Sequence, residues 1–90
     1  NDFVAVDLIK ALKKHGIKIP EDVLITGFDN SSESRIIEPH LTTIDIPSSK
    51  IGYIAADMLL SRIDDPDIPY RTTHVRTTTK YRASTGELNR

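Results

Sequence analysis

The first residues of the chain carry apolar side chains at the spacing of a helix. Four of them fall at i, i+4, i+7 and i+8: Val4, Leu8, Ala11 and Leu12. This spacing places them on one face of a helix. Asn1 or Asp2 can cap its start, because their side-chain oxygens accept orphan amide protons, and Gly16 follows its end. The pattern predicts a helix over residues 1–12.

A short apolar run, VLITGF at residues 23–28, follows a Pro-containing loop. It is too short for a helix and contains β-branched residues, so it predicts a strand buried on both faces, as in a parallel sheet. A helix, a short loop and a buried strand form half of a β-α-β unit.

The second half of the chain predicts two more strands and a second helix. LTTIDI at 41–46 is a strand candidate between Pro39 and Pro47, and residues 70–81 alternate as a strand with one polar face. The helix between them carries an apolar stripe of Ile51, Ala55, Met58, Leu59 and Ile63. The predicted order is α-β-β-α-β. A parallel sheet needs neighbours on both sides of a doubly buried strand, so we expect the chain to be a piece of a longer α/β protein whose earlier units complete the sheet.

Composition narrows the function classes. Among 90 residues there are 12 basic and 13 acidic side chains and no cysteine, so neither bulk attraction to nucleic acid nor thiolate chemistry is predicted. No apolar run approaches the roughly 20 residues of a membrane-spanning helix. The histidines at 15, 40 and 74 lack metal-ligand spacing, and no nucleophile or phosphate-loop motif occurs. We therefore expect no enzyme activity, no catalytic residue, no metal site and no cofactor.

Asp29 is the candidate with the most distinctive position. It follows Gly27 and Phe28 at the carboxyl end of the predicted strand, where ligands bind in open α/β sheets. Its carboxylate can accept hydrogen bonds from hydroxyl groups of a ligand, or it can start an Asx-turn. Asn1 can likewise either cap the helix or contact a ligand. The pattern favours the cap.

Five motifs in a fixed order carry a family resemblance. They are GIKIPED at 16–22, GFD at 27–29, LTTI at 41–44, GYIA at 52–55 and RAST at 82–85. Together they resemble the C-terminal part of the effector-binding domain of the lactose/galactose-repressor family of bacterial transcription regulators. The resemblance implies a periplasmic-binding-protein-like (type I) α/β fold with two subdomains around a cleft. It assigns residues 1–45 and 70–85 to the C-terminal subdomain, 46–65 to a helix of the N-terminal subdomain and 86–90 to a tail.

The resemblance also implies a function and site residues. Asp29 and Asn1 are expected to bind a small effector, carbohydrate or nucleoside-like, in the intersubdomain cleft. Operator DNA is the expected partner of a helix-turn-helix outside this chain, in a cytoplasmic homodimer with no membrane contact. The dimer face is expected to include Val4, Leu8, Ile36 and Ile37, although ordinary core positions are equally consistent with the two isoleucines.

Three positions depart from the family pattern. Asn30 stands where a second acid is common, His40 replaces a frequent proline, and Ile46 replaces a frequent glutamine. Asp45 lies one residue before Ile46, and its side chain is expected on the opposite face of the strand.

Two other classes remain open. A periplasmic sugar-binding transport protein has the same fold, but PEDVLITGFDN and PHLTTIDIP favour the regulator. An enzyme on an α/β scaffold would need reactive groups that these residues do not supply. As an isolated piece, the chain is expected to self-associate through sheet edges and the apolar face of its second helix.

Overall fold

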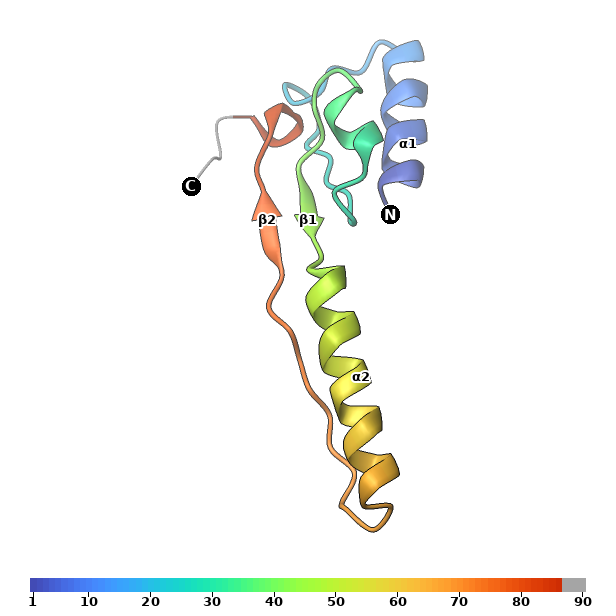
Figure 1. Ribbon diagram of the computed structural model, residues 1–90. Coiled ribbons are helices and arrows are strands. Elements are labelled where there is room, and N and C mark those ends of the chain that lie inside the picture. The colour runs from blue at the N-terminus through green and yellow to red at the C-terminus, as the bar shows by residue number, and fades with distance from the viewer. Residues whose placement is uncertain (87–90) are drawn as a thin grey trace. The chain divides into compact units, whose positions relative to one another are not determined.

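The computed structural model describes residues 1–86 (Figure 1). The elements are α1 (Asp2–Lys14), a 3₁₀ helix (Ser32–Arg35), β1 (Thr43–Asp45), α2 (Ser48–Asp64), β2 (Thr78–Lys80) and a second 3₁₀ helix (Ala83–Thr85). They form two compact units. The first contains Asn1–Ile46 and residues 78–86, and the second contains Pro47–Thr77. Apart from Gly86, the tail predicted at 86–90 lies outside the described residues. The predicted assignment to two subdomains concerns the complete domain and stays a prediction.

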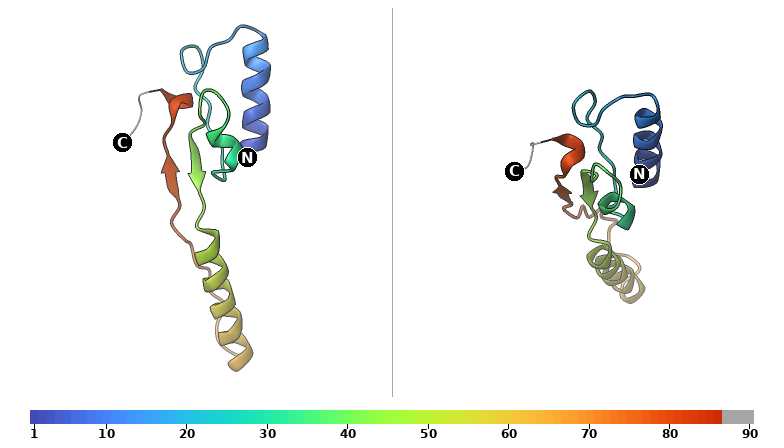
Figure 2. Two further views of the ribbon diagram at one scale, coloured as in Figure 1. Left: turned by 45° about the horizontal axis from the view of Figure 1, so that its top comes forward. Right: turned by 90° about the horizontal axis from the view of Figure 1, so that it is seen from above.

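The first unit is built around β1. It pairs antiparallel with β2 in the register Thr43↔Lys80, Ile44↔Thr79 and Asp45↔Thr78, and Figure 2 shows the two strands side by side. The predicted strand at 70–81 was therefore too long. Since β1 ends at Asp45, it offers partners only to the last part of that segment, and residues 70–77 form no ladder.

The predicted strand at 23–28 forms only a single parallel bridge, Thr26↔Thr42. The segment is extended along β1, where the Gly27 N–H donates to the Thr42 carbonyl at 2.8 Å. It has a hydrogen-bonding neighbour on that side only, so the element order is α-β-α-β rather than α-β-β-α-β. The expectation of burial on both faces was also wrong. Ile25 is buried, whereas Leu24 and Phe28 on the other face stay exposed.

The core of the first unit lies between α1 and these extended segments. It consists of Ala5, Val6, Ile9, Ile19, Ile25 and Leu41. The stripe predicted from the sequence faces elsewhere, because Val4, Leu8 and Ala11 are exposed and Leu12 is partly buried. The helix has apolar residues around most of its circumference, so its spacing alone does not identify the core face.

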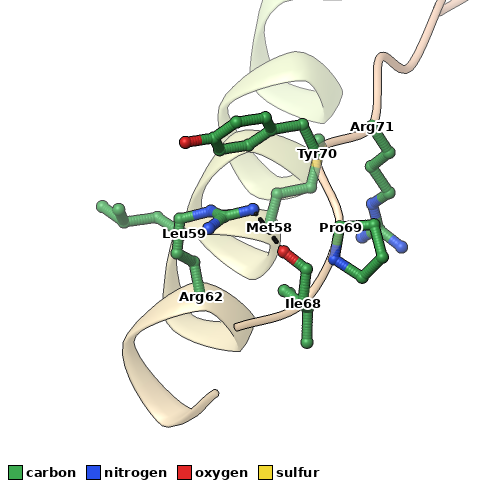
Figure 3. A pocket seen from close by; sticks show the side chains of 7 residues that line it. All are labelled: Met58, Leu59, Arg62, Ile68, Pro69, Tyr70 and Arg71. Atoms are coloured by element: carbon green, nitrogen blue, oxygen red, sulfur yellow. Dashed lines mark hydrogen bonds between the residues drawn. The ribbon is translucent and has the colours of Figure 1, made fainter. Parts of the chain in front are cut away.

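The second unit consists of α2 and the segment that returns along it. No residue of α2 is buried, and Ile51, Leu59 and Ile63 of its predicted stripe are exposed. The end of the helix is held by Arg62, whose guanidinium donates to the carbonyls of Pro66 and Ile68 and lies 4.6 Å from the centre of the Tyr70 ring (Figure 3). No helix among the described residues has the length and apolar character to span a membrane.

Candidate functional site

Asp29 lies where the extended segment 23–28 ends beside β1. Its N–H donates to the Ile44 carbonyl at 2.9 Å, while its side chain is exposed. Asp29 has φ 118° and Asn30 has φ 50°, a region that residues other than glycine adopt rarely. Among the described residues, the Asp29 carboxylate accepts no hydrogen bond. The backbone is therefore held in place while the carboxylate stays free for another partner.

The loop after Asp29 is fastened to its surroundings by main-chain donors. The Asn30 N–H donates to the Thr43 hydroxyl at 3.1 Å, and the Ser31 N–H donates to the Asp2 carboxylate at 2.7 Å. These bonds offset the cost of two consecutive residues at positive φ. Asp29 is thus set on a rigid turn.

Asn1 caps α1. Its side-chain oxygen accepts the Val4 N–H at 3.1 Å, as the cap interpretation predicts. The structure also brings the helix start next to the candidate acid, because the Asp2 N–H donates to the carbonyl of Phe28, the residue before Asp29. Asn1 remains exposed, so its amide nitrogen can still meet a ligand.

The sequence offered Asp2 only as an alternative cap of the first helix, a role that Asn1 takes, although Asp2 organises this region. The residue is 1% exposed, and its carboxylate accepts the Ser31 N–H at 2.7 Å and the Thr43 hydroxyl at 2.8 Å. Burial by itself raises the pKa of Asp2, but these hydrogen bonds outweigh it, so the pKa lies below its ordinary value. Asp2 therefore remains a buried anion that ties α1 to the loop and to β1.

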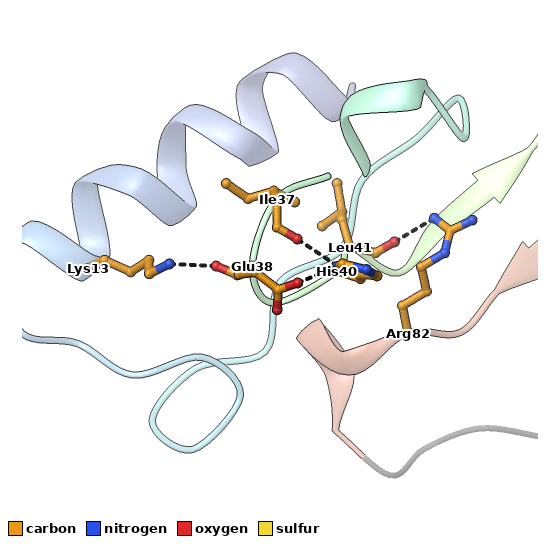
Figure 4. Close-up of polar contacts among 6 residues, drawn as sticks. All are labelled: Lys13, Ile37, Glu38, His40, Leu41 and Arg82. Carbon is orange, nitrogen blue, oxygen red and sulfur yellow. Dashed lines mark hydrogen bonds and ion pairs between the residues drawn. The ribbon is translucent and has the colours of Figure 1, made fainter. Parts of the chain in front are cut away.

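The RAST motif also holds this region in place through hydrogen bonds. Buried Ser84 donates to the Ile25 carbonyl at 2.6 Å and accepts the Thr42 N–H at 2.8 Å. The Arg82 guanidinium donates to the Leu41 carbonyl at 2.9 Å (Figure 4). In the sequence the motif served only to mark the family, but here it holds segment 23–28, which ends at Asp29, and the segment at Leu41 and Thr42 beside it.

The four residues predicted for a dimer face differ in exposure. Val4, Leu8 and Ile36 are exposed, with 66%, 45% and 74% of their surface accessible. Ile37 is partly buried and packs against the core. The first three are free to meet a partner, whereas Ile37 already has a packing role in the unit.

Two hollows lie away from these residues. One, of about 210 Å³, is lined by Met58, Leu59, Arg62, Ile68, Pro69, Tyr70 and Arg71 (Figure 3). The other, of about 400 Å³, is lined by Lys13, Gly16, Ile17, Lys18, Ile19, Glu21 and Pro39. Neither contains Asp29 or Asn1. Within residues 1–86, no three histidine or acidic side chains are grouped to hold a metal ion.

Comparison with known proteins identifies the family of the chain. Residues 1–85 match the periplasmic binding protein-like domain. The chain is 38% identical over 72 residues to the ribose operon repressor of Haemophilus influenzae, covering 80% of this chain and 22% of that protein. It is 35% identical over 89 residues to the transcriptional repressor PurR of Vibrio parahaemolyticus, covering 99% and 27%.

Solved structures of similar proteins support the same family. A LacI family transcriptional regulator from Enterococcus faecium, solved with bound ribose, matches with a TM-score of 0.78 and 36% identity over 99% of this chain and 33% of that one. The fold and the family match together define a periplasmic-binding-protein-like α/β domain. The chain belongs to the periplasmic binding protein-like domain family and is similar to part of LacI-type regulators, since it spans about a fifth to a third of the length of these relatives.

Proposed function

We propose that the chain is the C-terminal portion of the effector-binding domain of a ligand-responsive, DNA-binding transcription regulator. A small effector, sugar or nucleoside-like, binds in the cleft of the complete domain and contacts Asp29 and Asn1. Its binding alters operator binding by a helix-turn-helix elsewhere in the cytoplasmic protein. Such coupling is reciprocal and typically amounts to about 1–3 kcal/mol. Relatives that are repressors, and a similar regulator with bound ribose, support this class.

The observation that carries the proposal is the free carboxylate of Asp29 on a fastened turn. An exposed carboxylate on a held backbone, with no hydrogen-bond donor among the described residues, suits a ligand that brings hydroxyl donors, because the bond is charge-assisted. A periplasmic transport protein would present the same geometry, but the relatives at 35–38% identity are repressors, which favours regulation.

The Asp29→Ala variant of the full-length regulator tests the effector site. We expect sugar affinity to fall about tenfold or more, because one charge-assisted hydrogen bond is lost. Isothermal titration with D-ribose, D-xylulose, cellobiose and adenosine measures it. Asp57→Ala, at an exposed acid of α2, is the matched control and should retain affinity. Equal affinity of Asp29→Ala and the unaltered protein would remove Asp29 from the site.

The proposed homodimer has its own test. Val4 and Leu8 form an exposed apolar strip on α1, so a charge placed there should oppose apolar contact with a partner. We expect Leu8→Asp to shift the full-length protein from dimer toward monomer in sedimentation velocity. Lys10→Asp, at an exposed position of α1 outside this strip, is the control and should leave the dimer intact. A dimer that survives Leu8→Asp would exclude this face.

A further inference from the structure

The Arg82 side chain donates hydrogen bonds to three other residues of the first unit. One guanidinium nitrogen donates to the Ser34 hydroxyl and to the Leu41 carbonyl, both at 2.9 Å. The other donates to the Asn30 side-chain oxygen at 2.8 Å. The Arg82 N–H also donates to the Thr42 hydroxyl at 2.7 Å. The guanidinium is thus fixed by partners from three segments, and Asn30 is one of them.

These contacts determine how the Asn30 amide is oriented. A guanidinium only donates, so the amide oxygen must face Arg82 and the NH₂ must point away from it. That NH₂ donates to the Asp45 carboxylate at 3.3 Å. The amide therefore links a cation that needs an acceptor to an anion that needs a donor. An aspartate at position 30 would satisfy Arg82 but offer Asp45 only a like charge.

Asp45 stands next to the candidate effector acid. Asp45 directly follows Ile44, whose carbonyl accepts the Asp29 N–H at 2.9 Å. Asp29 and Asp45 therefore lie side by side, each at the end of its extended segment. Asp45 is half-buried, and its Oδ1 accepts the Asn30 amide. Among the described residues its Oδ2 accepts no hydrogen bond. As the alternation along β1 predicts, its side chain lies on the same face as Thr43.

We propose that Asp45 is a second effector-binding carboxylate and that Arg82 positions it through Asn30. This inference rests on the proposed effector site at Asp29. It names the ligand more closely: a polyhydroxylated molecule that presents separate donors to two carboxylates. It also accounts for one departure from the family pattern, because Asn30, where a second acid is common, supplies the donor that Asp45 needs.

The decisive variant is Asn30→Asp in the full-length regulator. An aspartate at position 30 still accepts a hydrogen bond from Arg82. Any contribution of that bond to stability is therefore retained. The substitution removes the donor to Asp45, so we expect affinity for the tightest-binding member of the panel D-ribose, D-xylulose, cellobiose and adenosine to fall about tenfold. The melting temperature should change little. Arg35→Ala is the control, because Arg35 reaches the same Asn30 oxygen only at 3.5 Å from an exposed position.

A double-mutant cycle separates positioning from general damage. Asp45→Ala alone should weaken binding about tenfold, and adding Asn30→Asp to it should cause no further loss. Arg82→Lys should behave as Asn30→Asp does, because lysine lacks the planar fork. Full additivity, or unchanged affinity in Asp45→Ala, would overturn the inference while Asp29→Ala still reports on the site. If the unaltered protein binds no panel member, the proposed carbohydrate or nucleoside effector fails, and this inference fails with it.

Discussion

Replacing Gly27 with alanine should destabilise the protein by about 3 kcal/mol, the upper range for overpacking a filled site. A Cβ on Gly27 would collide with the Asp2 carboxylate and lie 2.7 Å from the Leu41 Cδ2. Neither neighbour can retreat easily, because Asp2 is held by two hydrogen bonds and Leu41 is fully buried. The glycine of the Gly-Phe-Asp motif thus makes room for the buried acid.

Urea unfolding followed by circular dichroism measures this loss. Gly52→Ala is the matched control, because a Cβ there meets nothing within 4 Å and the residue lies inside α2. The control should gain about 0.5–1 kcal/mol from helix propensity. Equal stability of Gly27→Ala and the unaltered protein would show that Asp2 can leave its position at little cost.

The sequence predicted the helices and the family better than the strands. Both helices form close to their predicted bounds, since apolar spacing and caps are local signals. The strands at 23–28 and 70–81 depend on neighbours, and most of their residues have none in the described structure. Strand propensity shows that a segment can adopt an extended backbone. A hydrogen-bonded ladder also requires a neighbouring strand of matching length.

The sequence pointed to Asp29 as a site residue, which stays a prediction, and the structure places Asp29 where the extended segment 23–28 ends. The groups that hold it were not predictable, because they come from residues far apart in the chain. Ser31 bonds to Asp2 across 29 positions, and Arg82 bonds to Asn30 across 52. Arg82 was visible only as part of a family motif, and Asp2 resembled an ordinary helix-start acid. A buried polar role depends on tertiary contacts that periodicity does not encode.

Asp2 should also give the protein a specific loss of stability in acid. Its folded pKa is lowered, so its charge stabilises the fold fully above the ordinary carboxyl pKa of about 3.9. That contribution is lost as the pH falls below this value and through the folded pKa. Asp2→Asn keeps the size of the side chain but places an NH₂ among donors. We expect it to cost about 2 kcal/mol at pH 7.

Urea unfolding at pH 7 and at pH 3 tests the sign of this effect. Since asparagine does not titrate, the difference in unfolding free energy between the unaltered protein and Asp2→Asn should shrink at pH 3. Asp57→Asn, an exposed acid on α2, should change stability by less than about 0.5 kcal/mol at pH 7. If the difference for Asp2→Asn is equal at both pH values, the charge of Asp2 does not contribute to it. The loss would then come from the NH₂ that Asn places against the Ser31 and Thr43 donors.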